Sequence, residues 1–269
     1  MKWAAVKPYL QVAKNTWNNA LTYRINVLLW RFRMVLQLLA TYFLWLAVIP
    51  ANKTVLGYSQ SAMLTYVLAS AVISAIVFSS LVGAVGEEIN KGDLSNYLLK
   101  PVNYFAYWLA RDAGDKAMNI CFAVVEITLI ILILRPPVFL QANLLYVFLS
   151  IVSVVMAILL YFLMNFLLGL IGFWSSEVWA PRFIFFTIYA FFSGGIFPLD
   201  ILPKPFFIFF QILPFPYLLY FPIKLYLGQL SILEIILGFL ASGIWLFLLF
   251  KFLQWGWQKG LKQYTAQGR

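Results

Sequence analysis

Glu126 stands where a carboxylate can do chemistry, near the middle of the apolar run 117–134. A carboxylate at that depth is costly unless it is protonated, paired or next to water. Glu126 can therefore attract a cation or a proton, or it can be a neutral glutamic acid bonded across helices, and the sequence leaves both open. Arg31 and Arg33 are the less favoured partners, because they stand nearer the end of their own apolar run.

The rest of the sequence offers little catalytic chemistry. It contains no histidine, which removes the commonest general base and the commonest metal ligand together. It has no paired aspartates within its apolar runs and no G-x-x-x-x-G-K-[ST] phosphate loop. We therefore expect no catalytic, cofactor-binding or metal-binding residue in this chain, and we do not expect an enzyme.

The composition is that of an integral membrane protein. Hydrophobic residues make up 64% of the 269 residues and charged residues only 10%, whereas a soluble domain carries about 25% charged residues. The apolar runs are continuous, as in membrane helices, and do not alternate as in barrel strands. We predict an all-α protein with six transmembrane helices, at about 23–49, 62–85, 117–134, 144–174, 182–197 and 232–255.

The basic residues predict the orientation of these spans. Of the 19 Lys and Arg residues, fifteen fall in segments on the side of both termini. The other four, Lys53, Arg135, Lys204 and Lys224, fall in segments on the opposite side. The positive-inside rule thus places both termini in the cytoplasm of a bacterial plasma (inner) membrane. Because the charges are spread over helix ends, the net charge of +10 does not indicate a nucleic-acid partner.

Residues 1–22 are predicted to form an amphipathic helix before the first span. Val6, Leu10, Ala13 and Trp17 recur at spacings of three and four, with lysines on other faces. This pattern favours a helix lying in the membrane interface over one packed only on its own protein. We expect the whole chain, 1–269, to form a single transmembrane domain.

The polar insert 86–116 separates spans two and three. Gly92 can end the helix that carries Glu87 and Glu88, Asp93 or Ser95 can cap the next helix, and Pro101 can end it. The result is a short helix presenting Leu94, Tyr97 and Leu98 on the cytoplasmic side. Such a helix can dock a soluble partner or fold against its own bundle, and periodicity does not distinguish the two.

The segment 198–230 is apolar but contains six prolines. Prolines and glycines leave backbone groups unpaired, and such groups tolerate membrane depth only inside protein or beside water. We therefore predict a re-entrant hairpin in the outer leaflet before span six, in preference to an ordinary surface loop.

Two motifs resemble a known family. Glu87 and Glu88 are followed by K-G-D-L-S-N-Y-L-L-K-P-V at 91–102, and S-G-G-I-F-P stands at 193–198. Together with the six-span layout, they resemble the type-2 ABC-transporter permeases, most closely the multidrug or daunorubicin-exporter-like branch.

The resemblance implies a permease subunit whose motor is a separate chain. Partners would be a cytoplasmic ABC ATPase, which binds the ATP and Mg, a second permease (identical or a sister chain) and membrane lipids. The resemblance assigns ATPase coupling to Glu87, Glu88, Gly92, Asp93, Leu94, Tyr97, Leu98 and Pro101. It assigns the extracellular gate to Gly194, Gly195, Phe197 and Pro198.

The expected function is thus that of half of a dimeric ABC exporter for hydrophobic or cationic small molecules, with Glu126 as a candidate on the substrate pathway. An exporter of lipids or lipid-linked glycans is the first alternative. An ion-coupled secondary transporter is less favoured, because such proteins usually carry an internal repeat and several midplane charges.

Overall fold

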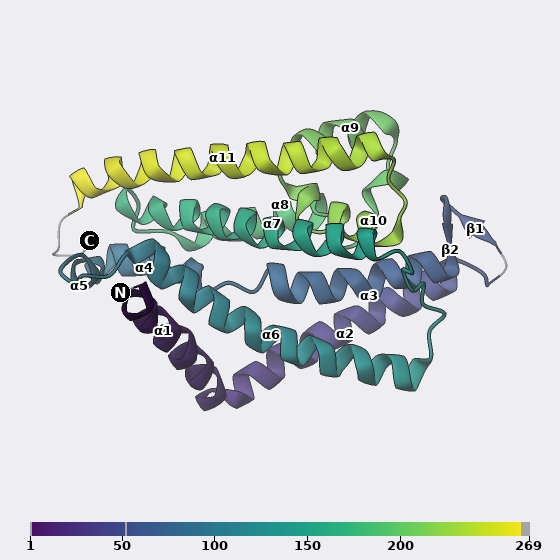
Figure 1. Ribbon diagram of the computed structural model, residues 1–269, viewed down its shortest axis with the longest axis horizontal. Coiled ribbons are helices and arrows are strands. Elements are labelled where there is room, and N and C mark those ends of the chain that lie inside the picture. Colours follow the sequence, from purple (N-terminus) through teal and green to yellow (C-terminus); the bar gives the residue numbers. More distant parts are fainter. Residues whose placement is uncertain (1, 52, 265–269) are drawn as a thin grey trace.

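The computed structural model describes residues 2–51 and 53–264 (Figure 1). Residue 1 of the predicted interfacial segment and residues 265–269 of the predicted basic tail lie outside the described residues. The elements in chain order are α1 (Lys2–Thr22), α2 (Arg24–Val48), β1 (Thr54–Val55), β2 (Tyr58–Ser59), α3 (Gln60–Val77), η1 (Val82–Ala84), α4 (Val85–Asn90), α5 (Leu94–Leu98), α6 (Tyr104–Leu134), α7 (Leu144–Gly169), η2 (Leu170–Phe173), α8 (Trp179–Phe192), η3 (Leu199–Ile201), α9 (Lys204–Ile212), η4 (Phe215–Tyr217), α10 (Tyr220–Leu227) and α11 (Ile232–Gln263).

The prediction of a helical membrane protein is confirmed. Five of the described helical segments are long and apolar enough to cross a membrane, namely α2, α3, α6, α7 with η2, and α11. On α2, α6 and α11 only 17% of the span is buried, and apolar side chains such as Leu240 (56%) and Phe247 (61%) on α11 are exposed, whereas α3 is more than half buried. So much exposed apolar surface is compatible with lipid as the solvent and not with water.

The predicted fifth span, 182–197, coincides in part with α8, a helix of 14 residues. At 1.5 Å per residue α8 is about 21 Å long, short of the roughly 30 Å hydrocarbon core. The number of six crossings therefore stays a prediction. The start of α1 and the end of α11 lie at the same end of the molecule as α4 and α5, opposite the β1–β2 hairpin (Figure 1).

Several predicted boundaries are corrected. The second span ends at Val77 instead of Val85, because the chain leaves the helix at residues 78–81 before η1 and α4. The third helix begins at Tyr104 instead of Ala117, and the Asn103 side chain caps it by accepting from the Ala106 amide. The last helix continues past Trp255 to Gln263.

The only strands in the described residues are β1 and β2, which pair antiparallel with Thr54 opposite Ser59. Leu56 and Gly57 between them both have positive φ. Positive φ at both central residues is the geometry of a tight hairpin turn. This hairpin is the one departure from the predicted all-α fold.

α1 forms as predicted and packs along α6. A Cβ on Gly114 of α6 would lie 2.5 Å from the Ala13 carbonyl oxygen, so this close approach needs a glycine. Val6 and Leu10 remain exposed on the free side of α1. The helix therefore packs on its own protein through one face and leaves apolar side chains exposed on another, and its position in a membrane interface stays a prediction.

Two buried clusters hold the elements together. The larger one joins α2, α3, α7 and α10 around fully buried side chains such as Met63 and Leu160. The smaller one centres on Trp108 and Phe166, and it fixes α4, α5 and the start of α6 against α7 and α11. This second cluster is what positions the segment with the predicted coupling residues.

Candidate functional site

The α4–α5 segment turns sharply at Gly92, as predicted. Gly92 has a φ of +80°, which favours glycine, and its carbonyl accepts a bond of 2.6 Å from the Tyr264 hydroxyl after α11. That hydroxyl in turn accepts from the Ser95 amide at 3.1 Å. Asp93 holds the N-cap position of α5 without a side-chain cap bond, and Ser95 instead donates to the Gly92 carbonyl.

The predicted docking side chains separate into buried and exposed groups. Leu94 is fully buried in the smaller core, and Tyr97 is partly buried, with its ring beside Tyr104. Leu98 is 47% exposed and the adjacent Leu99, which sequence reasoning did not single out, is 87% exposed. The free apolar surface of α5 is therefore made by Leu98 and Leu99, with Leu94 as its anchor.

Glu87 and Glu88 play different parts. Glu87 is exposed and lies 3.6 Å from Lys91. Glu88 accepts from the Tyr104 hydroxyl at 2.7 Å and lies 3.8 Å from Arg111. Burial raises the pKa of Glu88 above its usual range, against the opposing effects of these two partners.

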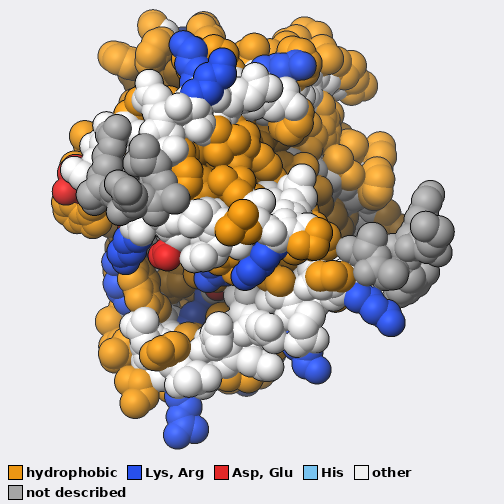
Figure 2. Space-filling model, turned by 90° about the vertical axis from the view of Figure 1, so that its left-hand side faces the viewer, with side chains coloured by type: hydrophobic (Ala, Val, Ile, Leu, Met, Phe, Trp, Pro, Cys, Tyr) orange, Lys and Arg blue, Asp and Glu red, His pale blue; other side chains and the backbone are white. Residues whose placement is uncertain are grey.

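The face that carries α4 and α5 is basic. Figure 2 views the molecule from this end and shows Lys and Arg side chains spread around it, with little Asp or Glu in view. Basic segments at one end of a membrane protein are typical of its cytoplasmic side. Pro101 stands in the exposed turn between α5 and α6.

The predicted gate residues lie at the opposite end of the molecule. Gly194 has a φ of +85° and its carbonyl accepts from the Tyr66 hydroxyl at 2.7 Å, which ties the segment to α3. Gly195 and Phe197 are partly buried, and Pro198 is buried. Residues 198–230 form only short helices, none of them long enough to span a membrane.

An ion pair between a buried lysine and a partly exposed aspartate, which sequence reasoning missed, fastens this segment. Lys224 of α10, with a side chain 7% exposed, lies 2.8 Å from Asp200 of η3. Its Nζ also donates to the Tyr58 hydroxyl at 3.0 Å, and Tyr58 donates to Asp200 at 2.8 Å. Burial and the nearby Asp200 carboxylate raise the pKa of Tyr58, so its hydroxyl remains a donor.

Glu126 is paired with Arg31, the partner that the sequence disfavoured. Arg31 Nε lies 2.7 Å from Oε1 of Glu126, and Nη2 lies 2.5 Å from Oε2. This two-pronged geometry is the strongest that arginine and a carboxylate can make. The pair joins α2 to α6 across 95 positions of the chain, and no spacing in the sequence indicates that the two residues meet.

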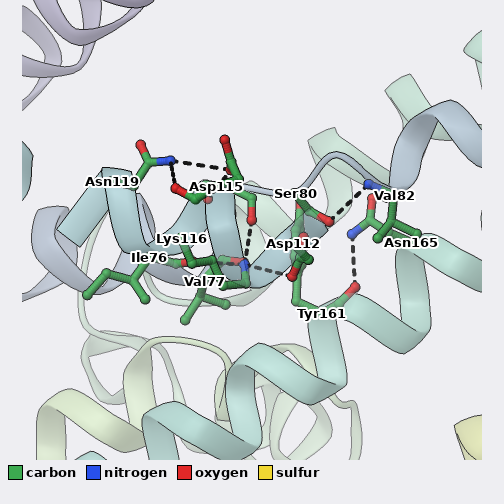
Figure 3. Close-up of polar contacts among 11 residues, drawn as sticks. Ile76, Val77, Ser80, Val82, Asp112, Asp115, Lys116, Asn119, Tyr161 and Asn165 are labelled. Atoms are coloured by element: carbon green, nitrogen blue, oxygen red, sulfur yellow. Dashed lines mark hydrogen bonds and ion pairs between the residues drawn. The ribbon is translucent and has the colours of Figure 1, made fainter. Parts of the chain in front are cut away.

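Glu126 belongs to a longer row of polar side chains on α6, which we call the α6 polar ladder: Asp112, Asp115, Lys116, Asn119 and Glu126. Lys116 pairs with Asp112 at 3.3 Å and donates to the carbonyls of Ile76 and Val77 (Figure 3). It also donates to the carbonyl of Ser79. The carbonyls of Ile76 and Val77 lie at the C-terminal end of α3, and that of Ser79 lies just after it. Lys116 thus satisfies backbone groups that a helix end leaves unpaired.

Asp115 and Asn119 of the ladder connect the end of α3 to the Arg31–Glu126 pair. Asp115 accepts from Ser79 at 2.6 Å and from the Asn119 amide at 3.3 Å, and Asn119 accepts from Arg31 at 3.0 Å. Sequence reasoning divided this row between an insert and a span. The spacing of 112, 116 and 119, which recur on one helical face, was the signal that could have found it.

Comparison with known proteins agrees with this architecture. The family described as "ABC-2 family transporter protein" matches residues 35–268, nearly the whole chain. The chain therefore belongs to the ABC-2 transporter family, and it is a multi-pass membrane transport subunit that associates with an ABC ATPase. No curated protein matches it.

Proposed function

We propose that this chain is the permease half of an ATP-driven exporter. A second permease, identical or a sister chain, would complete the translocation pathway, and a cytoplasmic ATPase would bind the ATP and Mg. The single observation that carries the proposal is the α4–α5 segment, a glycine-turned pair of short helices with exposed Leu98 and Leu99 at the basic end of a family member.

The proposed topology has six crossings in the plasma membrane of a bacterium, with both termini in the cytoplasm. Both ends of the described chain lie at one end of the molecule (Figure 1), which supports an even number of crossings. α8, with the chain beyond it up to η3, would form the fifth of the six crossings. α9 and α10 would then form the re-entrant roof of the pathway, with Gly194, Gly195, Phe197 and Pro198 in the gate.

Glu126 would face the substrate path, where its carboxylate favours cationic small molecules. Hydrophobic small molecules are proposed from the resemblance to multidrug exporters. The pairing of Glu126 with Arg31 lowers the net charge at the site and leaves lipids or lipid-linked glycans as the alternative substrates. An ion-coupled transporter is the remaining alternative. Dependence of transport on ATP, and not on an ion gradient, would exclude it.

Co-purification tests the proposal directly. The tagged chain is extracted in mild detergent from cells that contain its natural partners, and the bound proteins are identified. Leu98→Asp and Leu99→Asp place charge on the exposed surface of α5 and should each reduce recovery of the ATPase at least tenfold. Leu56→Asp, in the exposed hairpin turn at the opposite end, is the matched control and should retain it.

An ATPase recovered with the parent chain and with Leu56→Asp, but lost from the α5 variants, supports both the permease function and the docking surface. If no ATPase accompanies any of the four proteins, the exporter proposal is wrong.

A further inference from the structure

The Arg31–Glu126 pair lies between two hollows of different character. On the inner side is a cavity of about 120 Å³ between α2, α3 and α6, whose wall includes the polar side chains of Gln37, Thr41, Ser70 and Ser74. On the outer side is an open groove of about 540 Å³ along α2. Both hollows are lined by Arg31 and Glu126, so the ion pair separates an open apolar groove from a smaller cavity whose lining mixes polar and apolar side chains.

The groove is apolar along its length. Its lining, apart from the ion pair, consists of Ile25, Leu28, Leu29, Phe32 and Val35. These residues recur at spacings of three and four, so they share one face of α2. Ile25 is 71% exposed and Phe32 is 63% exposed. An extended hydrocarbon tail lying along α2 would therefore meet apolar contacts up to the Glu126 carboxylate.

Arg31 and Glu126 differ in how many hydrogen-bonding groups each has left for a ligand. Arg31 donates through Nε and Nη2 to Glu126 and through Nη1 to Asn119 and to the sulfur of Met34. Its side chain is 7% exposed. Only one of its five N–H groups therefore lacks an acceptor among the described residues. An anionic head group would find almost no free donor here.

The Glu126 carboxylate has hydrogen-bond acceptor sites that no described residue uses. Within the described residues it accepts only the two bonds from Arg31, whereas a carboxylate offers about four acceptor sites. Its side chain is 21% exposed, three times as much as that of Arg31. A primary ammonium group supplies up to three N–H donors and a positive charge, which complements the remaining acceptor sites.

We propose that this groove binds single-tailed cationic amphiphiles from the lipid phase, with the tail along α2 and the ammonium group on Glu126. The binding site stands on the geometry of the groove and the pair. Its role as the place where substrate is loaded rests on the proposed exporter function. The cavity behind the pair, with Gln37, Thr41, Ser70 and Ser74 in its wall, would then receive the head group once the ammonium has competed with Arg31 for Glu126.

The test uses the full chain in phosphatidylcholine nanodiscs without ATPase or nucleotide. The probe is a long-chain fatty amine with a dansyl group at the end of its tail, and the control probe is the fatty acid with the same labelled tail. Energy transfer from the protein's tryptophans to the dansyl group measures binding, after subtraction of transfer in nanodiscs that hold an unrelated membrane protein. We expect saturable binding of the amine, at least tenfold tighter than that of the acid.

Three variants locate the site. Glu126→Gln removes the charge and should weaken amine binding about tenfold without changing binding of the acid. Leu28→Trp fills the groove and should weaken binding of the amine at least fivefold. Leu36→Trp, an exposed position on α2 outside the residues that line the groove, is the matched control and should leave binding unchanged.

The variant Glu126→Gln leaves the buried Arg31 without its carboxylate and can lower stability. The double variant Arg31→Met with Glu126→Met removes both charges, an exchange that is often neutral for folding, and it should likewise lose the preference for the amine. A monodisperse elution profile identifies the variants that remain folded.

The proposal is overturned if the amine and the acid bind equally, as an ordinary lipid surface would bind them, or if the folded double variant keeps the preference. Because the assay contains no ATPase, its failure leaves the co-purification result intact. A failed co-purification would equally leave the binding site standing.

Discussion

Lys116 and Lys91 each form an ion pair with an acidic residue four positions earlier, but in opposite environments. Lys116 and Asp112 lie 3.3 Å apart with side chains 7% and 1% exposed. Lys91 and Glu87 lie 3.6 Å apart with side chains 69% and 62% exposed. The chain thus contains a buried pair and an exposed control of nearly equal geometry. We predict that Lys116→Met is far more destabilising than Lys91→Met.

The magnitude follows from what each substitution leaves behind. Lys116→Met leaves the buried Asp112 without a counter-charge and the broken end of α3 without the donor that three of its carbonyls share. Removing one member of a buried pair costs about 3–5 kcal/mol. An exposed pair contributes about 0–1 kcal/mol, which is all that Lys91→Met can remove.

Thermal unfolding in detergent measures the difference. For a chain of this size 1 kcal/mol corresponds to roughly 2–4 °C in the midpoint, so we expect Lys116→Met to lower it by about 6–20 °C. Lys91→Met should lower it by less than about 4 °C. Intrinsic fluorescence and size-exclusion after heating give two independent midpoints.

A double variant completes the test. Adding Asp112→Leu to Lys116→Met removes the uncompensated carboxylate and should restore part of the lost stability. If Lys116→Met and Lys91→Met unfold at the same temperature, burial of the pair is not what holds α3 to α6. If the double variant is no more stable than Lys116→Met, the cost does not lie in an unpaired charge.

Three further predictions concern other parts of the fold. Asp200→Asn leaves the buried Lys224 without a counter-charge and should lower the free energy of unfolding by about 1–3 kcal/mol. It should also speed hydrogen exchange over residues 199–212. Unchanged exchange would show that the ion pair does not fasten this segment. Gly172→Ala would place a Cβ 2.6 Å from the Gly86 carbonyl oxygen and should cost about 1–3 kcal/mol; Gly243→Ala, with nothing within 4 Å, should not lower the thermal midpoint. Burial raises the pKa of Glu88 in the folded protein, so the folded state binds this proton more tightly than the unfolded state and stability should fall as pH rises through the raised pKa. Glu88→Gln should remove this part of the pH dependence of the thermal midpoint. A pH profile that is the same in Glu88→Gln would contradict the prediction.

The sequence by itself determined the class of the protein. Continuous apolar runs with few charges can fold only where lipid is the solvent, and the helices α2, α3, α6, α7 and α11 follow these runs. The glycine turn at Gly92 was also readable, because a positive φ is a property of one residue and its neighbours. The two motifs were sufficient to indicate the family that comparison then showed.

Only the tertiary structure decided which polar groups meet. Arg31 stands 95 positions from Glu126, and Lys224 stands 24 positions from Asp200, so neither pair leaves a local pattern. Lys116 appeared to belong to a solvated insert, and its burial becomes visible only when the broken end of α3 is placed beside α6. The physical reason is that periodicity records which face of a helix is apolar, whereas the partner of a buried charge is chosen by how helices cross.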